Sequence, residues 1–290
     1  MPRSNLRLYV ICPEKGNLFF DTILEGTKKA EEELEDLDVK IEYLFTPYNN
    51  ISRQMQLLEQ VINIRPDGIA ILPFGTTELN HLIDEAVDND IPVVTFNNDA
   101  PYSKRFCFVG PDNYSSGKLC GNIMGNFLPL ESNILILSGS NDIYALKQRL
   151  LGFKDKIKSS YPEIKTLNIF DYAENEDICY TYIMNEFSNN NSIDGIYVSS
   201  AIGCNAIGKA LKELNLSSPP KTIGFEPNKL FSEYITEGLF QAFIYQAPYT
   251  QGYLSLKTLY DYVASGLVPE AENIYTKNEI AMLENFDNFT

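Results

Sequence analysis

The feature of this chain that most restricts its fold is a regular alternation between short apolar runs and longer segments with helical spacing. The runs are rich in β-branched and aromatic residues and cover residues 6–11, 39–45, 68–73, 91–96, 133–138, 166–171, 195–199, 221–225 and 241–246. Between them, segments such as ISRQMQLLEQVINI place Ile51, Met55 and Leu58 on one helical face. This pattern predicts repeated β-α-β units and a mostly parallel sheet.

The length and the number of runs indicate more than one sheet. The chain has 290 residues, which exceeds the usual size of a single domain, about 100 to 200 residues. The early runs carry few charges, as strands covered on both faces by helices do. We therefore predict an α/β protein of two doubly wound, Rossmann-like lobes, each with a parallel sheet of about five or six strands.

The net charge and the cysteine content indicate which binding partners and which cellular location to expect. The chain has 23 basic and 39 acidic residues and a net charge of −16, which would repel a phosphate backbone, so this chain alone should not bind nucleic acid. It lacks an apolar run of the length that a membrane helix or a secretory signal needs, so we expect a soluble protein without a membrane partner. Five cysteines without a CxxC pair favour a reducing cytoplasm, with most thiols in the core.

The sequence offers little material for catalysis. It has a single histidine, His81, no paired cysteines, and neither GxGxxG nor GxxxxGK[ST]. We therefore predict no catalytic residues, no metal and no cofactor, and we favour a binding module over an enzyme. An enzyme stays the weaker alternative, because acidic pairs are present and fold does not prove function.

Polar and aromatic residues follow several of the predicted strands. Open parallel sheets bind ligands beyond the carboxyl ends of their strands, and the loops there read CPEKGNLFF, NNDAPYSK, EPNK and QAPYTQG. The GNLFF stretch is the most unusual, because it places an Asn and two Phe at the start of a predicted helix. The loops after the predicted strands are rich in Asn, Gln, Glu and aromatic residues and contain no Gly-rich phosphate loop. These loops therefore predict a small-molecule site.

Several ordered motifs resemble a known family. They are GNLFF followed by Gly26, then RPDGIAILP, IPVVTF, FVGPDNYSSGKLCGNIM, QRLLGF with Arg149, AIGKAL with TIGFE, and AFIYQAPYTQG. Together they resemble the type I periplasmic-binding-protein fold, in the form shared by ribose-binding proteins and the effector domains of lactose/galactose-repressor-type (LacI/GalR family) transcriptional regulators. The resemblance covers nearly all of the chain.

The resemblance implies a set of ligand-binding residues. Phe19 and Phe20 would stack on the sugar faces, and the polar rim would be bound by Asn17, Asn97, Asn98, Arg149, Glu226 and Gln246. Two alternatives stay open: Phe19 and Phe20 as a hydrophobic staple, and Glu226 as the cap of a following helix. The chain has Asn97-Asn98 where many sugar-binding relatives have an Asp-Arg pair, which favours a neutral ligand. Residues 172–176 and 199–205 align too loosely to assign contacts.

The resemblance also implies an organisation and a role. One lobe would contain residues 1–111 and 247–270 and the other residues 112–246 and 271–290, joined by a multi-strand hinge, with the DNA-binding headpiece absent from this chain. We expect a cytoplasmic, homodimeric effector-binding domain for transcription regulation. It would close its lobes on a small neutral sugar or sugar derivative and reach DNA only through an attached helix-turn-helix. The alternatives are an exported sugar-binding receptor of a transporter and the sensor domain of a membrane kinase.

Overall fold

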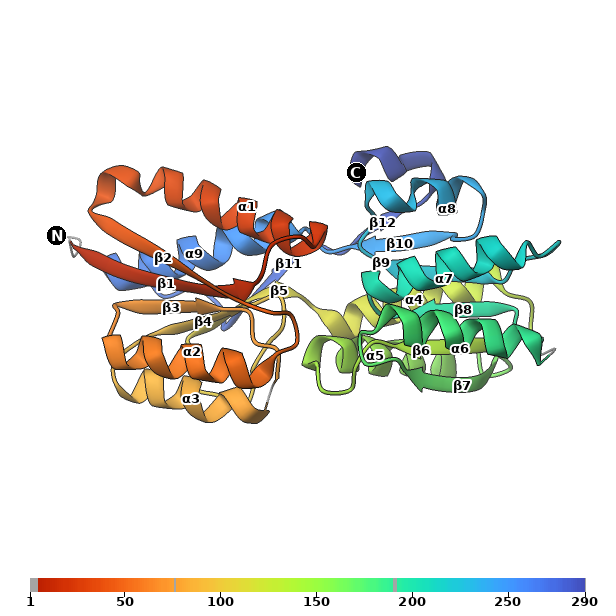
Figure 1. Ribbon diagram of the computed structural model, residues 1–290, viewed down its shortest axis with the longest axis horizontal. Helices are drawn as coiled ribbons and strands as arrows, with labels where there is room; N and C mark the ends of the chain where they lie inside the picture. The colour runs from red at the N-terminus through yellow and green to blue at the C-terminus, as the bar shows by residue number, and fades with distance from the viewer. Residues whose placement is uncertain (1–4, 76, 190–191, 290) are drawn as a thin grey trace. The chain divides into compact units, whose positions relative to one another are not determined.

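The chain forms two compact α/β units, each built on one six-stranded sheet (Figure 1). The computed structural model describes residues 5–75, 77–189 and 192–289. Unit 1 comprises Met1–Pro111, Asp142–Tyr144 and Ala247–Thr276, and unit 2 comprises Asp112–Asn141, Ala145–Gln246 and Lys277–Thr290. The prediction of two doubly wound lobes with largely parallel sheets is confirmed.

The sheet of unit 1 has the order β11-β5-β4-β3-β1-β2, and all neighbouring strands in it run parallel. Helices α1 (Leu18–Glu33) and α9 (Pro248–Ser265) pack against one face, and α2 (Ile51–Ile64) and α3 (Thr77–Asp88) against the other. Apolar side chains therefore line both faces, as the low charge of the runs indicates. The strands are β1 (Leu6–Pro13), β2 (Val39–Thr46), β3 (Gly68–Ile71), β4 (Val93–Phe96), β5 (Cys107–Pro111) and β11 (Asn273–Thr276), and η1 (Glu35–Leu37) follows α1.

The sheet of unit 2 has the order β12-β10-β9-β8-β6-β7 and is parallel except that β12 runs antiparallel to β10. Helices α4 (Asn113–Phe127) and α5 (Tyr144–Ser160) cover one face, and α6 (Glu176–Ser188), α7 (Ala201–Leu214) and α8 (Ser232–Thr236) the other. The remaining elements are β6 (Asn133–Ser138), β7 (Lys165–Asp171), β8 (Gly195–Val198), β9 (Lys221–Phe225), β10 (Ala242–Tyr245), β12 (Glu279–Ala281), η2 (Lys229–Phe231) and η3 (Leu283–Phe289).

Three strands were not predicted from the sequence: β5, β11 and β12. They are short, with five, four and three residues, and each becomes a strand by pairing with a neighbour that is distant in the sequence. The pairing of β11 with β5 also places residues 271–276 in unit 1, although we expected them in the second lobe. The sequence pattern alone does not contain these long-range pairings.

In each unit two helices approach each other unusually closely. In unit 1, a Cβ on Gly26 of α1 would lie 2.0 Å from the carbonyl oxygen of Tyr249 in α9. In unit 2, a Cβ on Gly152 of α5 would lie 2.0 Å from the carbonyl oxygen of Tyr114 in α4. Both positions therefore need glycine for the close approach of two backbones rather than for a special dihedral angle. Gly152 lies one turn after Arg149, so this contact fixes where α5 carries that arginine.

All five cysteines are free and buried, so the prediction that most of the thiols belong to the core is confirmed. Burial raises the pKa of the Cys12 thiol to about 12 and that of Cys107 to about 11, which makes both poor nucleophiles. In the described parts of the chain, no helix combines the length and apolar character needed to cross a bilayer. The same residues contain no cluster of His, Cys, Asp and Glu that could hold a metal ion.

Candidate ligand-binding site

The two phenylalanines of GNLFF belong to a row of four aromatic rings in unit 1. Phe19 meets Phe20 edge to face with centroids 5.4 Å apart, Phe20 lies 5.0 Å from Tyr48, and Tyr48 lies 5.5 Å from Phe74. Tyr48 follows β2 and Phe74 follows β3, so the row lies at the carboxyl end of the sheet. Phe74 is buried, whereas the other three rings are partly exposed. The exposed end of the row can therefore offer aromatic surface to a ligand.

Asn17 begins the helix that carries this pair. Its side-chain oxygen accepts the backbone N–H of Phe19 at 3.0 Å, which makes it the N-cap of α1. In a hydrophobic staple, the residue before the cap contacts the fourth helical residue. Here those positions are Gly16 and Asp21, so Phe19 and Phe20 do not form a staple. The oxygen of Asn17 serves the helix, which leaves its amide nitrogen as the group suited to a ligand.

Asn97 and Asn98 follow β4 directly and are buried. Asn97 has a left-handed backbone with φ 62°, a conformation that Asn tolerates better than most residues. Its Nδ2 donates to Oε1 of Gln251 in α9 at 3.0 Å, and its backbone N–H donates to the carbonyl of Val109 at 3.0 Å. Nδ2 of Asn98 donates to the carbonyl of Pro73 at 2.6 Å. Both side chains are therefore held in place by unit 1 itself.

Arg149 of α5 lies at the centre of a polar cluster in unit 2 and is buried. Its Nε donates to Oδ1 of Asn113 at 2.8 Å and its Nη1 to the carbonyl of Ser199 at 2.7 Å, while Nη2 donates to Oε1 of Gln246. The guanidinium also lies 4.2 Å from the ring centroid of Phe225. A guanidinium has five N–H groups, so two of them have no acceptor among the residues that the structure describes. These two can donate to a ligand.

Glu226 follows β9 and is the most perturbed acid of unit 2. Its side chain is buried, and its Oε1 has no hydrogen-bond partner among the described residues. Burial raises the pKa of the carboxyl to about 8, against the opposing effects of the Arg149 charge and of the backbone N–H of Gln246. Glu226 is therefore protonated near neutral pH and offers an acceptor oxygen that no described residue uses.

Gln246 follows β10 and is completely buried. Besides accepting from Arg149, its Nε2 donates to Ser116 Oγ at 3.3 Å and to Asn113 Oδ1 at 3.4 Å. Asn113 and Ser116 lie in the first turn of α4. Three strand-end loops and two helices of unit 2 thus meet at Arg149.

Asn97 and Glu226 occupy equivalent places in the two units. Each is the first residue after a strand, each has a left-handed backbone, with φ 62° and 58°, and each donates its backbone N–H to the next strand. The acceptors are the carbonyls of Val109 in β5 and Ile244 in β10, at 3.0 and 2.9 Å. The internal symmetry of the fold therefore places one amide and one acid at matching strand ends, where open parallel sheets bind ligands.

The structure brings some of the predicted residues into direct contact within a unit. Phe19 touches Phe20, Arg149 bonds to Gln246, and the charge of Arg149 acts on Glu226. Sequence reasoning missed further members of these clusters: Tyr48, Phe74, Asn113, Ser199 and Gln251. Asn113 lies in the quoted GPDN motif and Tyr48 in the loop after a predicted strand, so the sequence could have placed both residues at strand ends. Their contacts were not.

The loosely aligned loops 172–176 and 199–205 contribute to unit 2 in two ways. The carbonyl of Ser199 accepts from Arg149, as described above. The hydroxyl of Ser200 bonds to the Tyr172 hydroxyl at 2.6 Å and caps α7 by accepting the N–H of Gly203. Ser200 therefore takes the N-cap role at the start of α7.

Comparison with known proteins identifies the family. Residues 8–266 match the periplasmic binding protein domain. The chain belongs to this family. It is 23% identical to the D-ribose/D-allose-binding protein of Pseudomonas aeruginosa over 92% of its own length and 84% of that protein. It is likewise 23% identical to the ribose import binding protein RbsB of Bacillus subtilis, over 85% of this chain and 78% of that protein.

A solved structure shows the same fold. The solute-binding protein of an ABC transporter from Burkholderia graminis, in complex with D-arabinose, superposes with a TM-score of 0.90 at 22% identity. The superposition covers 99% of this chain and 98% of that one. These relatives are binding proteins and not enzymes, in agreement with the prediction of a binding module.

The comparisons overturn part of the sequence interpretation. The relatives carry the names of a ribose- and allose-binding protein, an import binding protein and a transporter solute-binding protein, not of LacI-family regulators. The assignment to transcription regulation, with DNA reached through an attached headpiece, was therefore wrong, and so was the cytoplasmic location. The homodimer, inferred from how regulators read paired half-sites, loses its basis as well. The error arose because motifs shared by the whole fold were given to one branch of it.

Proposed function

We propose that this chain is the sugar-binding protein of an ABC transporter and acts outside the cytoplasm. The observation that carries the proposal is the buried cluster around Arg149, where two N–H groups and the Oε1 of Glu226 have no partner among the described residues. Unpaired buried polar groups cost free energy unless a ligand or water satisfies them. A sugar rim, with hydroxyls that both donate and accept, suits such a set.

The aromatic row of unit 1 supports the same ligand class. Phe19 and Phe20 are partly exposed at the carboxyl end of the sheet, where the C–H face of a sugar ring can stack on them. Asn97 and Asn98 supply neutral amides beside β4 rather than a charged pair. We therefore propose a neutral monosaccharide rather than an amino acid, whose ammonium and carboxylate groups would each require an opposite charge.

The transporter role is supported by the names of the relatives. Two of them are named for ribose, with D-allose as a second sugar for one, and the matched solved structure contains D-arabinose. D-ribose, D-allose and D-arabinose are therefore the first candidate ligands for this chain. The proposed site comprises Asn17, Phe19, Phe20, Asn97, Asn98, Arg149, Glu226 and Gln246.

Isothermal titration calorimetry and thermal melting test the ligand class. We expect at least one of the three sugars to bind with a stoichiometry near one and to raise the melting temperature. A ligand at about a hundredfold above its Kd adds about 2.7 kcal/mol to the unfolding free energy. Amino acids and nucleobases serve as comparison ligands. If these compounds raise the melting temperature and no monosaccharide does, the proposal is wrong.

Variants in each unit test the site. Asn97→Ala in unit 1 and Arg149→Lys in unit 2 should each weaken binding of the same sugar. His81→Ala is the matched control, because His81 is exposed on α3, on the other side of unit 1 from α1 and α9. Affinity that is unchanged in either site variant would exclude that unit from the site.

A further inference from the structure

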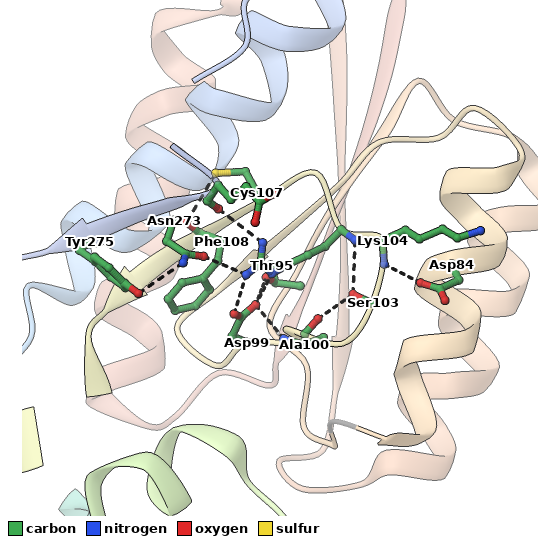
Figure 2. A network of polar contacts seen from close by, with 12 residues as sticks. Asp84, Thr95, Asp99, Ala100, Ser103, Lys104, Cys107, Phe108, Asn273 and Tyr275 are labelled. Carbon is green, nitrogen blue, oxygen red and sulfur yellow. Dashed lines mark hydrogen bonds and ion pairs between the residues drawn. The ribbon is translucent and has the colours of Figure 1, made fainter. Parts of the chain in front are cut away.

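The loop between β4 and β5 contains a buried ion pair that the site description does not use (Figure 2). Nε and Nη2 of Arg105 donate to the two carboxylate oxygens of Asp99 at 2.5 and 2.8 Å. The two side chains are only 6% and 10% exposed. This bidentate geometry is the strongest form of a carboxylate–guanidinium contact.

Asp99 fastens the loop to the end of β4. Its Oδ1 also accepts the hydroxyl of Thr95 and the backbone N–H of Ala100, both at 2.8 Å. Thr95 is the penultimate residue of β4, and Asn97 stands between Thr95 and Asp99. Because the chain is fixed on both sides of Asn97 and Asn98, the orientation of these two amides depends on the Asp99 carboxylate.

Arg105 extends the network to β11. Its Nη2 also donates to Oδ1 of Asn273, the first residue of β11, at 2.8 Å (Figure 2). Its Nη1 donates to the carbonyl of Glu272, the residue before β11, at 3.4 Å. Asn97 itself bonds to β5 and α9, as described above. β5 ends at Pro111, α9 begins directly after Ala247 and β11 ends at Thr276, and each of these residues is a point where the chain passes between the units. The loop is thus bonded, within unit 1, to all three of these elements.

A contribution to the stability of the fold does not explain why this ion pair is buried. Removing two charges from water costs several kcal/mol per ion, and well-packed apolar residues often stabilise a protein as well or better. A second ion pair of the same loop shows the contrast: Lys104 bonds to Asp88 at 2.7 Å, but both side chains are more than half exposed. An exposed pair of this kind contributes little. The buried pair instead restricts the loop to one conformation, because its two parallel hydrogen bonds require a fixed geometry.

We propose that Asp99 and Arg105 are positioning residues that hold Asn97 and Asn98 in the orientation used for the ligand and tie them to β11. The ligand part of this inference rests on the proposed sugar-binding function. The positioning part concerns the ligand-free protein and stands independently of it.

Amide hydrogen exchange of the ligand-free protein tests the positioning. In Asp99→Asn and in the milder Arg105→Lys, exchange should become at least about tenfold faster at residues 97–100 and 273–276, because both segments lose a shared anchor. The control Lys104→Ala removes the exposed pair of the same loop and should leave those amides unchanged. Unchanged exchange in the Asp99 and Arg105 variants, or equal acceleration in the control, overturns the proposal.

A double-mutant cycle with D-ribose tests the link to the ligand. Arg105→Lys and Asn97→Ala should each weaken D-ribose binding about tenfold, and together by clearly less than the product, because Arg105 acts through Asn97. Losses that multiply would show independent effects and overturn the positioning role. If the unaltered protein binds no monosaccharide, the proposed function fails, and the exchange experiment alone still decides whether the pair orders the loop.

Discussion

Replacing Glu226 with Gln tests the claim that this buried acid is neutral in the folded protein. The ordinary pKa of a glutamate carboxyl is 4.5, and burial raises that of Glu226 to about 8. Each unit of pKa difference between the folded and unfolded states corresponds to about 1.4 kcal/mol. The ionised carboxylate therefore destabilises the fold by roughly 5 kcal/mol at the upper limit.

The sign of the effect follows from which state binds the proton. Below pH 4.5 the carboxyl is protonated in both states and stability does not depend on it. Between pH 4.5 and about 8 the folded protein keeps a proton that the unfolded chain has lost, so the free energy of unfolding falls as pH rises. Above pH 8 the full penalty is present. Glu226→Gln preserves the shape of the side chain and removes this titration.

Urea unfolding of both proteins between pH 5 and pH 9 measures the difference. The unfolding free energy of the unaltered protein should fall relative to that of Glu226→Gln by several kcal/mol across this range, with a slope approaching about 1.4 kcal/mol per pH unit. Because all other titrating groups are common to the two proteins, the difference isolates Glu226. Parallel curves would show that Glu226 is ionised in the folded state and would refute the argument from burial.

Three further changes have expected outcomes. Phe19→Ala should lower the apo unfolding free energy by only about 1 kcal/mol, the scale of one aromatic pair, yet weaken sugar binding; a variant that melts far lower and binds normally would exclude the stacking role. Arg149→Ala should lower both sugar affinity and the unfolding free energy, by about 3 kcal/mol or more, because it leaves several buried groups unpaired; an unchanged urea midpoint would contradict the cluster. Gly26→Ala should lower the unfolding free energy by about 1 to 3 kcal/mol, because the added methyl group forces α1 away from α9. The control Gly238→Ala has open space around its Cβ position and tests only backbone strain. Equal melting temperatures for Gly26→Ala and the unaltered protein would rule out the close contact.

The sequence by itself determined the class of fold. Of the twelve strands in the described part of the chain, nine could be predicted because each is a β-rich run bounded by helical segments. A buried parallel strand such as GIAILP carries no charge on either face. The same pattern placed the polar and aromatic residues at strand ends. GNLFF, NNDAP and FEPNK could therefore be singled out before any contact was known.

The branch of the family and the cellular location could not be predicted from the sequence pattern. The motifs that resemble the family describe how any member folds and where it presents polar groups, because they are imposed by strand ends and helix starts. They are common to transporter receptors and regulators, so they do not distinguish the two. The relatives found over most of the chain are named as sugar-binding and transporter proteins, not as regulators.

Tertiary structure alone decided what each candidate residue does. Arg149 could be recognised as a site residue, but only the fold brings the distant Asn113, Ser199 and Gln246 around its guanidinium. No sequence motif marks the Asp99–Arg105 pair. Its importance comes from burial and from a third partner, Asn273, which follows more than a hundred residues later in the chain. Periodicity encodes which face of an element is buried, whereas a hydrogen bond between distant segments exists only once the sheet order has placed them side by side.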